Sequence, residues 1–502
     1  MARLAAKAVS KTYGATKALR RGDLEVEAGE VHVLIGSNGS GKSTLCKIVA
    51  GSVRPDGGQL LLEGRPMTVS GPEAARKLGI GIFYQELSLA AHRSVAENIL
   101  LSDLPGGLFV NRKALNAKAQ RYIDLFQGVT GDDFHADATV ETLRPDQRQL
   151  VEIMKALSSE APVLIFDEPT SALDRAQVDR FFEILRRLKD DGRSIVFISH
   201  RMDEIFALGD RVTVIRDGET VATKRIAETD PAEVIRLMVG GEETLAAAEP
   251  HQPTAAAATA KTVLAVSGLS GAGFRDVAFD VAAGEILGLG GLHGQGQSAV
   301  LRALFGAPLP SSGSVQLNGV TLNPSSPRAT IGRGIAYVSG DRRRDGVISG
   351  RPILENVTPI HAVKQRLALA SPSALKAKAA PALEALRTKF ATFNHPISSL
   401  SGGNQQKIVI ARWLIDRPDV LLLDDPTKGI DLSAKTDLFQ LIRKLAAEGM
   451  AIVLYSSEDA ELLGNADRIL VFNGGRITRE LTGEQRTRFN LYQAAYEAGE
   501  AA

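Results

Sequence analysis

The stretch "EVHVLIGSNGSGKSTLCKIVAG", Glu30 to Gly51, decides the fold of this chain. It begins with an apolar run of strand length, continues through a glycine-rich loop and ends in a helical pattern. Glycines let backbone N–H groups come close to anionic oxygens, which the N-terminus of the following helix also attracts. A strand, a loop of this form and a helix, in that order, predict a phosphate-binding P-loop in an α/β domain.

Two side chains of the loop carry specific chemistry in this prediction. Lys42 supplies positive charge to the outer phosphates of a nucleotide, and Ser43 supplies a hydroxyl for Mg²⁺. A glycine-rich turn without a ligand is the plainer alternative, which the intact strand and helix disfavour. The residues expected to contact the nucleotide are Gly36, Ser37, Asn38, Gly39, Ser40, Gly41, Lys42, Ser43 and Thr44.

An acidic pair follows a second apolar run in "VLIFDEPTSALD", Val163 to Asp174. Two successive carboxylates at the end of a buried strand are costly unless they are paired, bound to metal or exposed to solvent. A plain strand end is a common explanation, but the upstream P-loop favours a site at the carboxyl edge of a parallel sheet. We expect Asp167 to hold Mg²⁺ through water and Glu168 to polarise the attacking water.

Two further polar residues follow apolar strands, Gln85 in "GIFYQEL" and His200 in "IVFISH". A lone Gln or His at a strand end is more often a hydrogen-bonded structural residue. Their order after the P-loop favours a role in sensing the nucleotide, and Gln85 is also a candidate Mg²⁺ ligand.

The whole pattern occurs twice, with the second copy about 255 residues after the first. "GLHGQGQS", Gly291 to Ser298, repeats the P-loop but carries Gln297 in place of Lys42, and "VLLLDDPTKGID" repeats the acidic strand. Between the copies lies an Ala-rich segment with Pro and polar residues, which reads as a linker. The predicted boundaries are a first domain at 1–239, a linker at 240–262 and a second domain at 263–502.

Each copy contains a middle stretch with a helical pattern, at Val95 to Leu157 and at Ile353 to Ile415. The predicted fold is therefore α/β with an inserted helical subdomain, built twice in tandem.

Composition narrows the classes of function. Over 502 residues the net charge is +1, which disfavours a large nucleic-acid surface, so no nucleic-acid partner is expected. The single cysteine, Cys46, excludes an internal disulfide and a Cys-rich zinc site. No apolar run has the length of a membrane helix and no signal peptide is expected, so any membrane role would be peripheral.

In this order the motifs resemble those of the ATP-binding cassette superfamily over nearly the whole chain. Gly36 to Ser43 is similar to Walker A, Gln85 to the Q-loop, Val163 to Asp167 to Walker B and His200 to the switch histidine, with Glu168 as catalytic carboxylate. Tyr13 falls where the family stacks an aromatic ring on adenine. "LSGGNQQK", Leu400 to Lys407, resembles the signature motif. The resemblance implies ATP hydrolysis with ATP and Mg²⁺, and cassettes made of a RecA-like α/β core, an antiparallel β subdomain and a helical subdomain.

In this family two cassettes pack head to tail, and each ATP lies between the Walker motifs of one and the signature of the other. The resemblance therefore implies a complete first site, because the second copy's signature is intact. The signature residues assigned to it are Ser401, Gly402, Gly403, Asn404 and Gln405.

The second composite site is altered at every element. Its Walker residues are Gly291, Gly294, Gly296, Gln297, Ser298, Asp424, Asp425 and Ser457, with Gly340 at the Q-loop position, facing Arg144 and Asp146 of the first copy's "LRPDQRQ". Losing one charge-assisted phosphate contact costs roughly 1.5–3 kcal/mol, and Asp146 would repel the γ-phosphate. This site is expected to bind nucleotide weakly and to hydrolyse little.

Within the family the asymmetric tandem resembles bacterial sugar-importer ATPases of the ribose, xylose and galactose type, although Gly340 and the first signature depart from their pattern. The implied partners are two copies of an integral membrane permease and, indirectly, a periplasmic solute-binding protein. The implied location is the cytoplasmic face of the inner membrane. Candidate permease contacts are "ELSLAAHRSVAENI" and "GVISGRPILENV", whose apolar residues could equally belong to the subdomain core.

Three other classes remain open at the level of sequence. A tandem ATPase acting on ribosomes normally keeps both sites and a long charged linker, and a zinc-containing DNA-repair ATPase needs more than one cysteine. A purely regulatory binding module is disfavoured by the intact Glu168 and His200. The imported sugar or other solute is not specified by the sequence.

Overall fold

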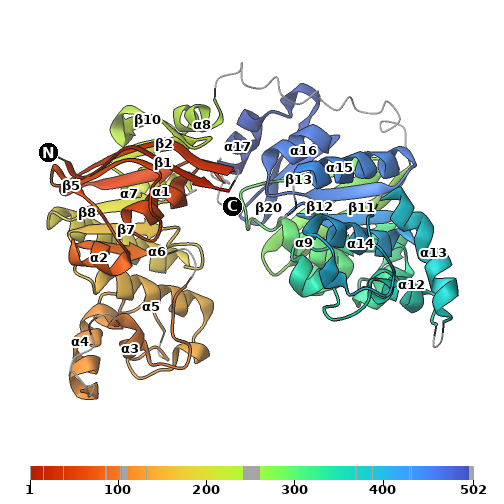
Figure 1. The fold of residues 1–502 in the computed structure, drawn as a ribbon, viewed down its shortest axis with the longest axis horizontal. Helices are drawn as coiled ribbons and strands as arrows, with labels where there is room; N and C mark the ends of the chain where they lie inside the picture. The colour runs from red at the N-terminus through yellow and green to blue at the C-terminus, as the bar shows by residue number, and fades with distance from the viewer. Residues whose placement is uncertain are drawn as a thin grey trace. The chain divides into compact units, whose positions relative to one another are not determined.

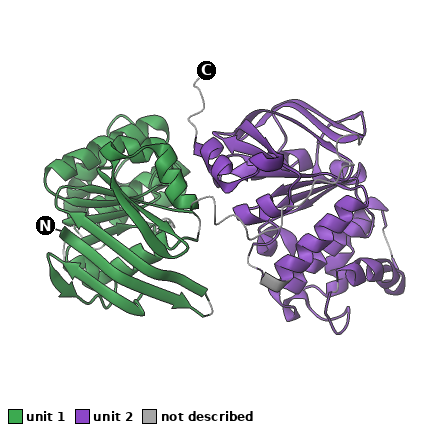
Figure 2. Ribbon diagram, turned by 90° about the horizontal axis from the view of Figure 1, so that it is seen from above, with its two compact units in different colours: residues 1–241 green, residues 242–502 purple. Residues whose placement is uncertain are grey.

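In the computed structural model the chain divides into two compact units, residues 1–241 and 242–502 (Figure 2). The described residues are 2–14, 16–37, 39–84, 87–101, 103, 111–131, 133–199, 201–240, 261–367, 370–386, 388–428, 430 and 432–496. We refer to the two units as the first and second cassettes. The predicted linker falls largely on 241–260, outside the described residues.

A parallel sheet forms the core of the first cassette because its strands are apolar on both faces. The strands β3 (Val31–Ile35), β8 (Ser194–Ile198) and β7 (Val163–Asp167) are buried throughout, and β6 (Ile80–Phe83) pairs in parallel with β7. Their carboxyl ends meet at one edge of the sheet. The P-loop, Asp167 and Ser199 therefore lie along that edge.

Six further strands extend this sheet to ten, in the order β5-β4-β1-β2-β10-β9-β3-β8-β7-β6. Among them β9 runs parallel to β3, and the pairs β9–β10, β1–β2, β1–β4 and β4–β5 are antiparallel. The junction is a single pairing of Glu219 on β10 with Arg21 on β2. The additional strands are β1 (Ala2–Tyr13), β2 (Thr16–Glu27), β4 (Gly57–Leu62), β5 (Arg65–Met67), β9 (Arg211–Arg216) and β10 (Glu219–Arg225).

Helices cover the sheet and form a separate subdomain at the end of the cassette away from β1 and β2 (Figure 1). That subdomain holds α3 (Val95–Ile99), α4 (Arg112–Asp124) and α5 (Pro145–Leu157), as the helical pattern predicted. The remaining helices are α1 (Lys42–Val49), α2 (Pro72–Lys77), α6 (Arg175–Asp190), α7 (Met202–Leu208) and α8 (Pro231–Val239).

The second cassette repeats this plan with two separate sheets. A six-stranded sheet has the order β16-β17-β18-β13-β19-β20, and a four-stranded sheet has the order β12-β11-β14-β15. The strands are β11 (Thr262–Gly271), β12 (Phe274–Ala282), β13 (Ile286–Gly291), β14 (Ser312–Leu317), β15 (Val320–Leu322), β16 (Ile335–Val338), β17 (Val420–Asp424), β18 (Ala451–Tyr455), β19 (Arg468–Asn473) and β20 (Arg476–Thr482).

Its helices follow the same pattern, with the predicted helical subdomain again present between β16 and β17. They are α9 (Gln297–Phe305), α10 (Pro327–Gly332), α11 (Ile353–Val357), α12 (Pro359–Lys364), α13 (Pro372–Ala385), α14 (Gly402–Leu414), α15 (Leu432–Ala447), α16 (Asp459–Asn465) and α17 (Arg488–Tyr496). The prediction of two tandem α/β cassettes is confirmed. In the described part of the chain no helix has the length and apolar character needed to cross a membrane.

Candidate nucleotide sites

The first P-loop has a backbone shape that requires glycine at two positions. Gly41, the N-cap of α1, has a φ of 107°, and a Cβ there would lie 2.7 Å from the Ala18 carbonyl oxygen. A Cβ on Gly36 would lie 2.1 Å from the Ile215 carbonyl oxygen. The loop is therefore a tight backbone cradle, as its sequence predicted. Asn38 lies outside the described residues.

Lys42 begins α1 and turns its ammonium back over this loop. Its Nζ donates to the carbonyl oxygens of Gly36 at 2.8 Å and Ser37 at 3.0 Å. Burial lowers the pKa of Lys42, while the charges of Glu168 and Asp167 act in the opposite direction. The lysine and the two carboxylates, about 125 residues apart in sequence, thus form one electrostatic group.

Asp167 ends β7 as a buried carboxylate within this group. Burial raises its pKa, a hydrogen bond with Ser43 and the charge of Lys42 lower it, and the charge of Glu168 raises it further. Ser43 and Asp167 are therefore in contact, in the pairing expected for the two groups that would serve Mg²⁺.

Glu168 follows with a φ of 52°, in the left-handed region that a non-glycine residue rarely adopts. Its backbone N–H donates to the Ile198 carbonyl oxygen at 3.1 Å, which ties the end of β7 to the neighbouring strand. Strained backbone of this kind is found where a side chain must be aimed at a functional site. Gln85 and His200, the other residues assigned to catalysis, lie outside the described residues.

A buried carboxylate that sequence reasoning missed lies beside this group. Glu204 on α7 accepts hydrogen bonds from Thr170 at 3.0 Å and from Ser199 at 2.7 Å. Thr170 follows the acidic pair and Ser199 precedes His200, so Glu204 joins the two segments that flank the catalytic residues. The apolar pattern around a single helical Glu gave no signal of this.

Tyr13 is the last residue of β1 and is 47% exposed, with Lys11 Nζ 5.8 Å from its ring centroid. Its ring is thus available for stacking. The equivalent strand of the second cassette, β11, ends instead at Gly271. The second cassette thus has a glycine at the strand end where the first has an aromatic ring.

The second P-loop keeps the shape of the first. Gly296 caps α9 with a φ of 110°, and a Cβ on Gly291 would lie 2.3 Å from the Phe472 carbonyl oxygen. Gln297 is buried where Lys42 lies in the first loop, and its Nε2 donates to the carbonyls of Gly290 and Leu292, each at 3.1 Å. Gln297 therefore keeps one equivalent contact, since Leu292 matches Ser37 in the repeat, and makes its other hydrogen bond one residue earlier in the loop, without the charge of the lysine.

Both carboxylate oxygens of Asp424 are hydrogen-bonded by protein side chains. Ser298 Oγ donates to Oδ1 at 2.6 Å and Tyr337 OH donates to Oδ2 at 2.6 Å. Burial, together with the charge of Asp424, raises the pKa of Tyr337 well above its usual range, so the phenol remains a donor. The sequence pattern did not single out Tyr337.

Asp425 stands where the first cassette has Glu168 and shares its positive φ, at 52°. Its Oδ1 accepts hydrogen bonds from the backbone N–H and the hydroxyl of Ser457, both at 3.1 Å. The predicted catalytic position thus carries Asp425, a shorter acid than Glu168. Ser457, at the switch position, already hydrogen-bonds this acid. Such an arrangement leaves little reach toward an attacking water.

The two signature segments begin equivalent helices with different N-caps. Ser401 caps α14, where Asn404 Nδ2 donates to its hydroxyl at 3.1 Å, and Gly402 and Gly403 form the first turn. Gln405 donates to the Leu400 carbonyl at 3.0 Å. Arg144 takes the capping position of α5, so an exposed serine hydroxyl is replaced by a long cation.

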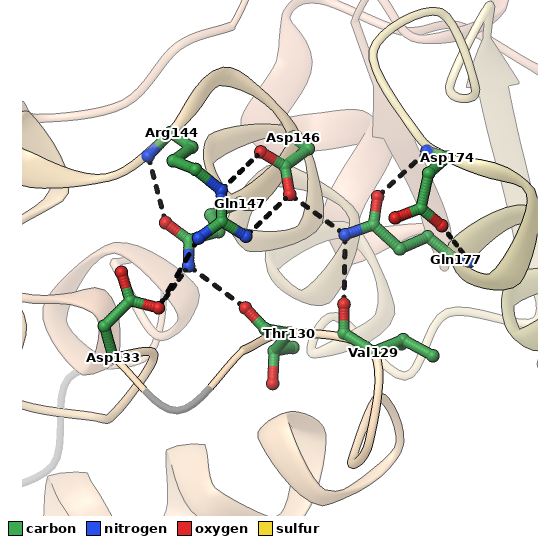
Figure 3. Close-up of polar contacts among 8 residues, drawn as sticks. All are labelled: Val129, Thr130, Asp133, Arg144, Asp146, Gln147, Asp174 and Gln177. Carbon is green, nitrogen blue, oxygen red and sulfur yellow. Dashed lines mark hydrogen bonds and ion pairs between the residues drawn. The ribbon is translucent and has the colours of Figure 1, made fainter.

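Arg144 and Asp146 form a closed polar network (Figure 3). Arg144 donates to both oxygens of Asp146 at 3.2 Å, and Gln177 Nε2 donates to Oδ2 at 3.0 Å. Although burial favours the neutral acid, the hydrogen bonds from Gln177 and Arg144 lower the pKa of Asp146. Asp146 is thus not an isolated charge, as the sequence suggested, but an ionised group whose charge is compensated by Arg144 and Gln177 within the first cassette.

These geometries define a tandem pair of nucleotide-binding cassettes, and the comparisons with known proteins agree. The ABC transporter family model matches residues 19–171 and 274–428, and the chain belongs to that family. It is 41% identical over 488 residues to a ribose import ATP-binding protein of Rhizobium meliloti (strain 1021), covering 97% of this chain and 95% of that protein.

A protein of Albidiferax ferrireducens, whose name gives ribose, galactose and methyl galactoside import, is 41% identical over 499 residues, covering 98% of this chain and 97% of that protein. Among solved structures, a nucleotide-free ATP-binding cassette from an ABC transporter aligns over 48% of this chain and 100% of its own, at 25% identity and a TM-score of 0.42.

Restoring the lysine of the second loop tests whether its absence alone prevents ATP hydrolysis at the second site. Gln297→Lys alone should leave the ATP turnover of the chain less than about twofold changed, because Asp424 and Asp425 remain occupied by their present partners. Steady-state phosphate release by purified wild-type and variant chains measures this. A doubling of turnover would mean that the lysine was the only missing element.

Proposed function

We propose that this chain is the ATP-hydrolysing subunit of an importer for a monosaccharide or related small polar solute. The observation that carries the proposal is the grouping of Lys42, Ser43, Asp167 and Glu168 at one edge of the first sheet. This is the set of groups that binds nucleoside triphosphate and activates water against it. Import of a sugar is supported by the names of the full-length relatives. They lend no support to the ribosome-directed alternative.

The first site also suits Mg²⁺. Ser43 and Asp167 offer a hydroxyl and a carboxylate, the hard oxygen ligands that the ion prefers, and the sequence adds Gln85 as a third candidate. The buried Ser40 Oγ, which has no hydrogen-bond partner among the described residues, leaves further polar capacity in the same loop. When bound, Mg²⁺ would neutralise charge on the outer phosphates. Lys42 would hold those phosphates, and Glu168 would orient the water.

The remaining assignments concern how the sites are completed. We propose that Ser401, Gly402, Gly403, Asn404 and Gln405 complete the first ATP site from the opposite cassette. The segment holding Arg144 and Asp146 would oppose the second site in the same way. One site would then hydrolyse ATP, and the other would bind nucleotide weakly while its cassette follows the same opening and closing.

The permease subunits would attach to the loops that precede α3 and α11. One buried asparagine fixes each loop: Asn98 bonds both backbone groups of Ala90, and Asn356 bonds both backbone groups of Ile348. Apolar residues of the helices themselves are buried, whereas Leu87 and Ile348 are 39% and 42% exposed. The proposed contacts are thus the exposed aliphatic residues on rigid loops rather than the whole predicted segments.

This arrangement would place the chain on the cytoplasmic face of the inner membrane, held there by two permease subunits that receive solute from a periplasmic binding protein. Reconstitution with the cognate permease in liposomes tests the proposal. ATP-dependent uptake of a pentose or hexose is the expected result. Association with ribosomes and no uptake would overturn it.

The docking loops can be tested separately from catalysis. Ile348→Asp and Leu87→Asp should each reduce recovery of the chain with permease-containing membranes at least about tenfold, because a desolvated charge would face an apolar contact. Basal ATPase activity of the free chain should persist. Leu309→Asp alters a 56% exposed leucine outside both loops and serves as the matched control. Equal membrane recovery of all three variants would exclude these loops as the docking surface.

A further inference from the structure

The second cassette contains a tyrosine hydroxyl bonded to the acid that ends β17. Tyr337, at the third position of β16, donates its hydroxyl to Asp424 Oδ2 at 2.6 Å, while Ser298 occupies Oδ1 at 2.6 Å. Asp424 is only 7% exposed, so few other directions of approach to the carboxylate remain. Ser43 makes the equivalent contact with Asp167 in the first cassette, so the Tyr337 hydroxyl is the additional partner that distinguishes Asp424.

Packing holds the tyrosine ring in this position. It stacks on Phe305 with ring centroids 5.2 Å apart and an interplanar angle of 25°, and Phe305 meets the edge of Trp413 at 5.8 Å. Aromatic contacts of this kind fix ring orientation beyond simple burial. The hydroxyl is therefore presented to Asp424 by a rigid support made from α9, β16 and α14.

The first cassette has no equivalent of this tyrosine and its supporting aromatic rings. By the repeat register its residues at the three aromatic positions are Ala50, Ile82 and Ala156, none of which has a side-chain donor. Ile82 lies on β6, which pairs with the strand that ends in Asp167, just as Tyr337 lies on β16 beside the strand that ends in Asp424. Tyr337 and its supporting rings thus distinguish the two sites at the carboxylate itself.

The neighbouring position offers no replacement ligand. A Cβ on Gly340, at the Q-loop position, would lie 2.8 Å from the Asp424 carbonyl oxygen and 3.1 Å from the Asp425 Cβ. A side chain at 340 would require a shift of the backbone. Position 340 therefore supplies no side-chain oxygen for Mg²⁺, and Tyr337 holds one oxygen of the carboxylate that the ion would use.

We propose that Tyr337 determines the metal specificity of the second site by excluding Mg²⁺, so that this site takes the nucleotide without its metal ion. The inference rests on the proposed function, because it assumes that the chain binds ATP. On this proposal the second site would bind nucleotide without hydrolysing it. The retained glycine loop could contact phosphate oxygens, but the metal ion that neutralises charge during phosphoryl transfer would be absent.

Counting bound metal tests the proposal. With the full chain, a saturating non-hydrolysable ATP analogue and Mn²⁺ as the probe, electron paramagnetic resonance should give one Mn²⁺ per wild-type chain. Tyr337→Phe keeps the ring and its stacking but frees Asp424 Oδ2, and should give two. Tyr455→Phe is the matched control, since its hydroxyl pairs with His293 at 2.9 Å rather than with Asp424, and should give one.

The outcomes separate the claims. Two Mn²⁺ per wild-type chain, or one in Tyr337→Phe, would overturn the role of Tyr337. No bound Mn²⁺ in the wild type would instead contradict the proposed ATPase function. In the Lys42→Ala background, addition of a chelator should leave analogue binding to the second site unchanged. Loss of that binding with the chelator would also overturn the proposal.

Discussion

Replacement of Glu168 by Gln is expected to slow ATP turnover by about 10²- to 10⁴-fold. The amide keeps the length of the side chain and the strained backbone position at φ 52°, but it cannot accept the proton of the attacking water. Nucleotide affinity should change only a fewfold, because the contacts of Lys42 with the loop are untouched. Steady-state phosphate release and equilibrium binding of a fluorescent nucleotide measure the two quantities.

Asp425→Asn is the matched control in the second cassette. The Asn amide oxygen can still accept the hydrogen bonds of Ser457, so the local structure should persist. Turnover should remain within about twofold of the wild type, because this site contributes little hydrolysis. Unchanged turnover in Glu168→Gln, or equal losses in both variants, would contradict the assignment of catalysis to the first site.

Removal of Lys42 should have the second largest effect. Lys42→Ala deletes a charge-assisted contact to phosphate worth roughly 1.5–3 kcal/mol, which weakens ATP affinity about ten- to a hundredfold. Turnover should fall as well, because the ammonium also balances the charges of Asp167 and Glu168. Titration with a fluorescent ATP analogue in the presence of Mg²⁺ measures the affinity of the first site.

Gln297→Ala is the counterpart of this change. It removes an uncharged side chain that also makes two hydrogen bonds to carbonyls of its own loop, so it controls for disturbance of the loop itself. The affinity of the tighter site should remain within about twofold of the wild type. If both variants weakened that site equally, the loss would reflect loop structure rather than the charge of Lys42.

Local sequence patterns predicted the elements that depend on neighbouring residues. The P-loop follows from glycine spacing between a strand and a helix, and Asp167 from its place after a buried apolar run. The duplication, the helical subdomains and the positions of Lys42 and Gln297 could be predicted for the same reason. Each of these features can be recognised from one continuous segment of the sequence, or from the comparison of that segment with its repeat.

Contacts between distant segments could not be predicted in this way. Tyr337 contacts Asp424 from the neighbouring strand, 87 residues away in sequence, and Gln177 contacts Asp146 from another helix. Each of these side chains looks ordinary in its own segment, where an isolated Tyr on a strand or a Gln on a helix has many explanations. Their roles depend on strand order and helix packing, which a single sequence does not specify at side-chain resolution.

The central claim, that the first Walker set turns over ATP and the second does not, is tested most directly by locating trapped product. Vanadate with a photoreactive azido-ATP would trap ADP at a hydrolysing site, and peptide mapping would identify the labelled cassette. We expect vanadate-dependent labelling within residues 1–241, lost in Glu168→Gln and kept in Asp425→Asn. Equal vanadate-dependent labelling around Gly291 to Ser298 would contradict it.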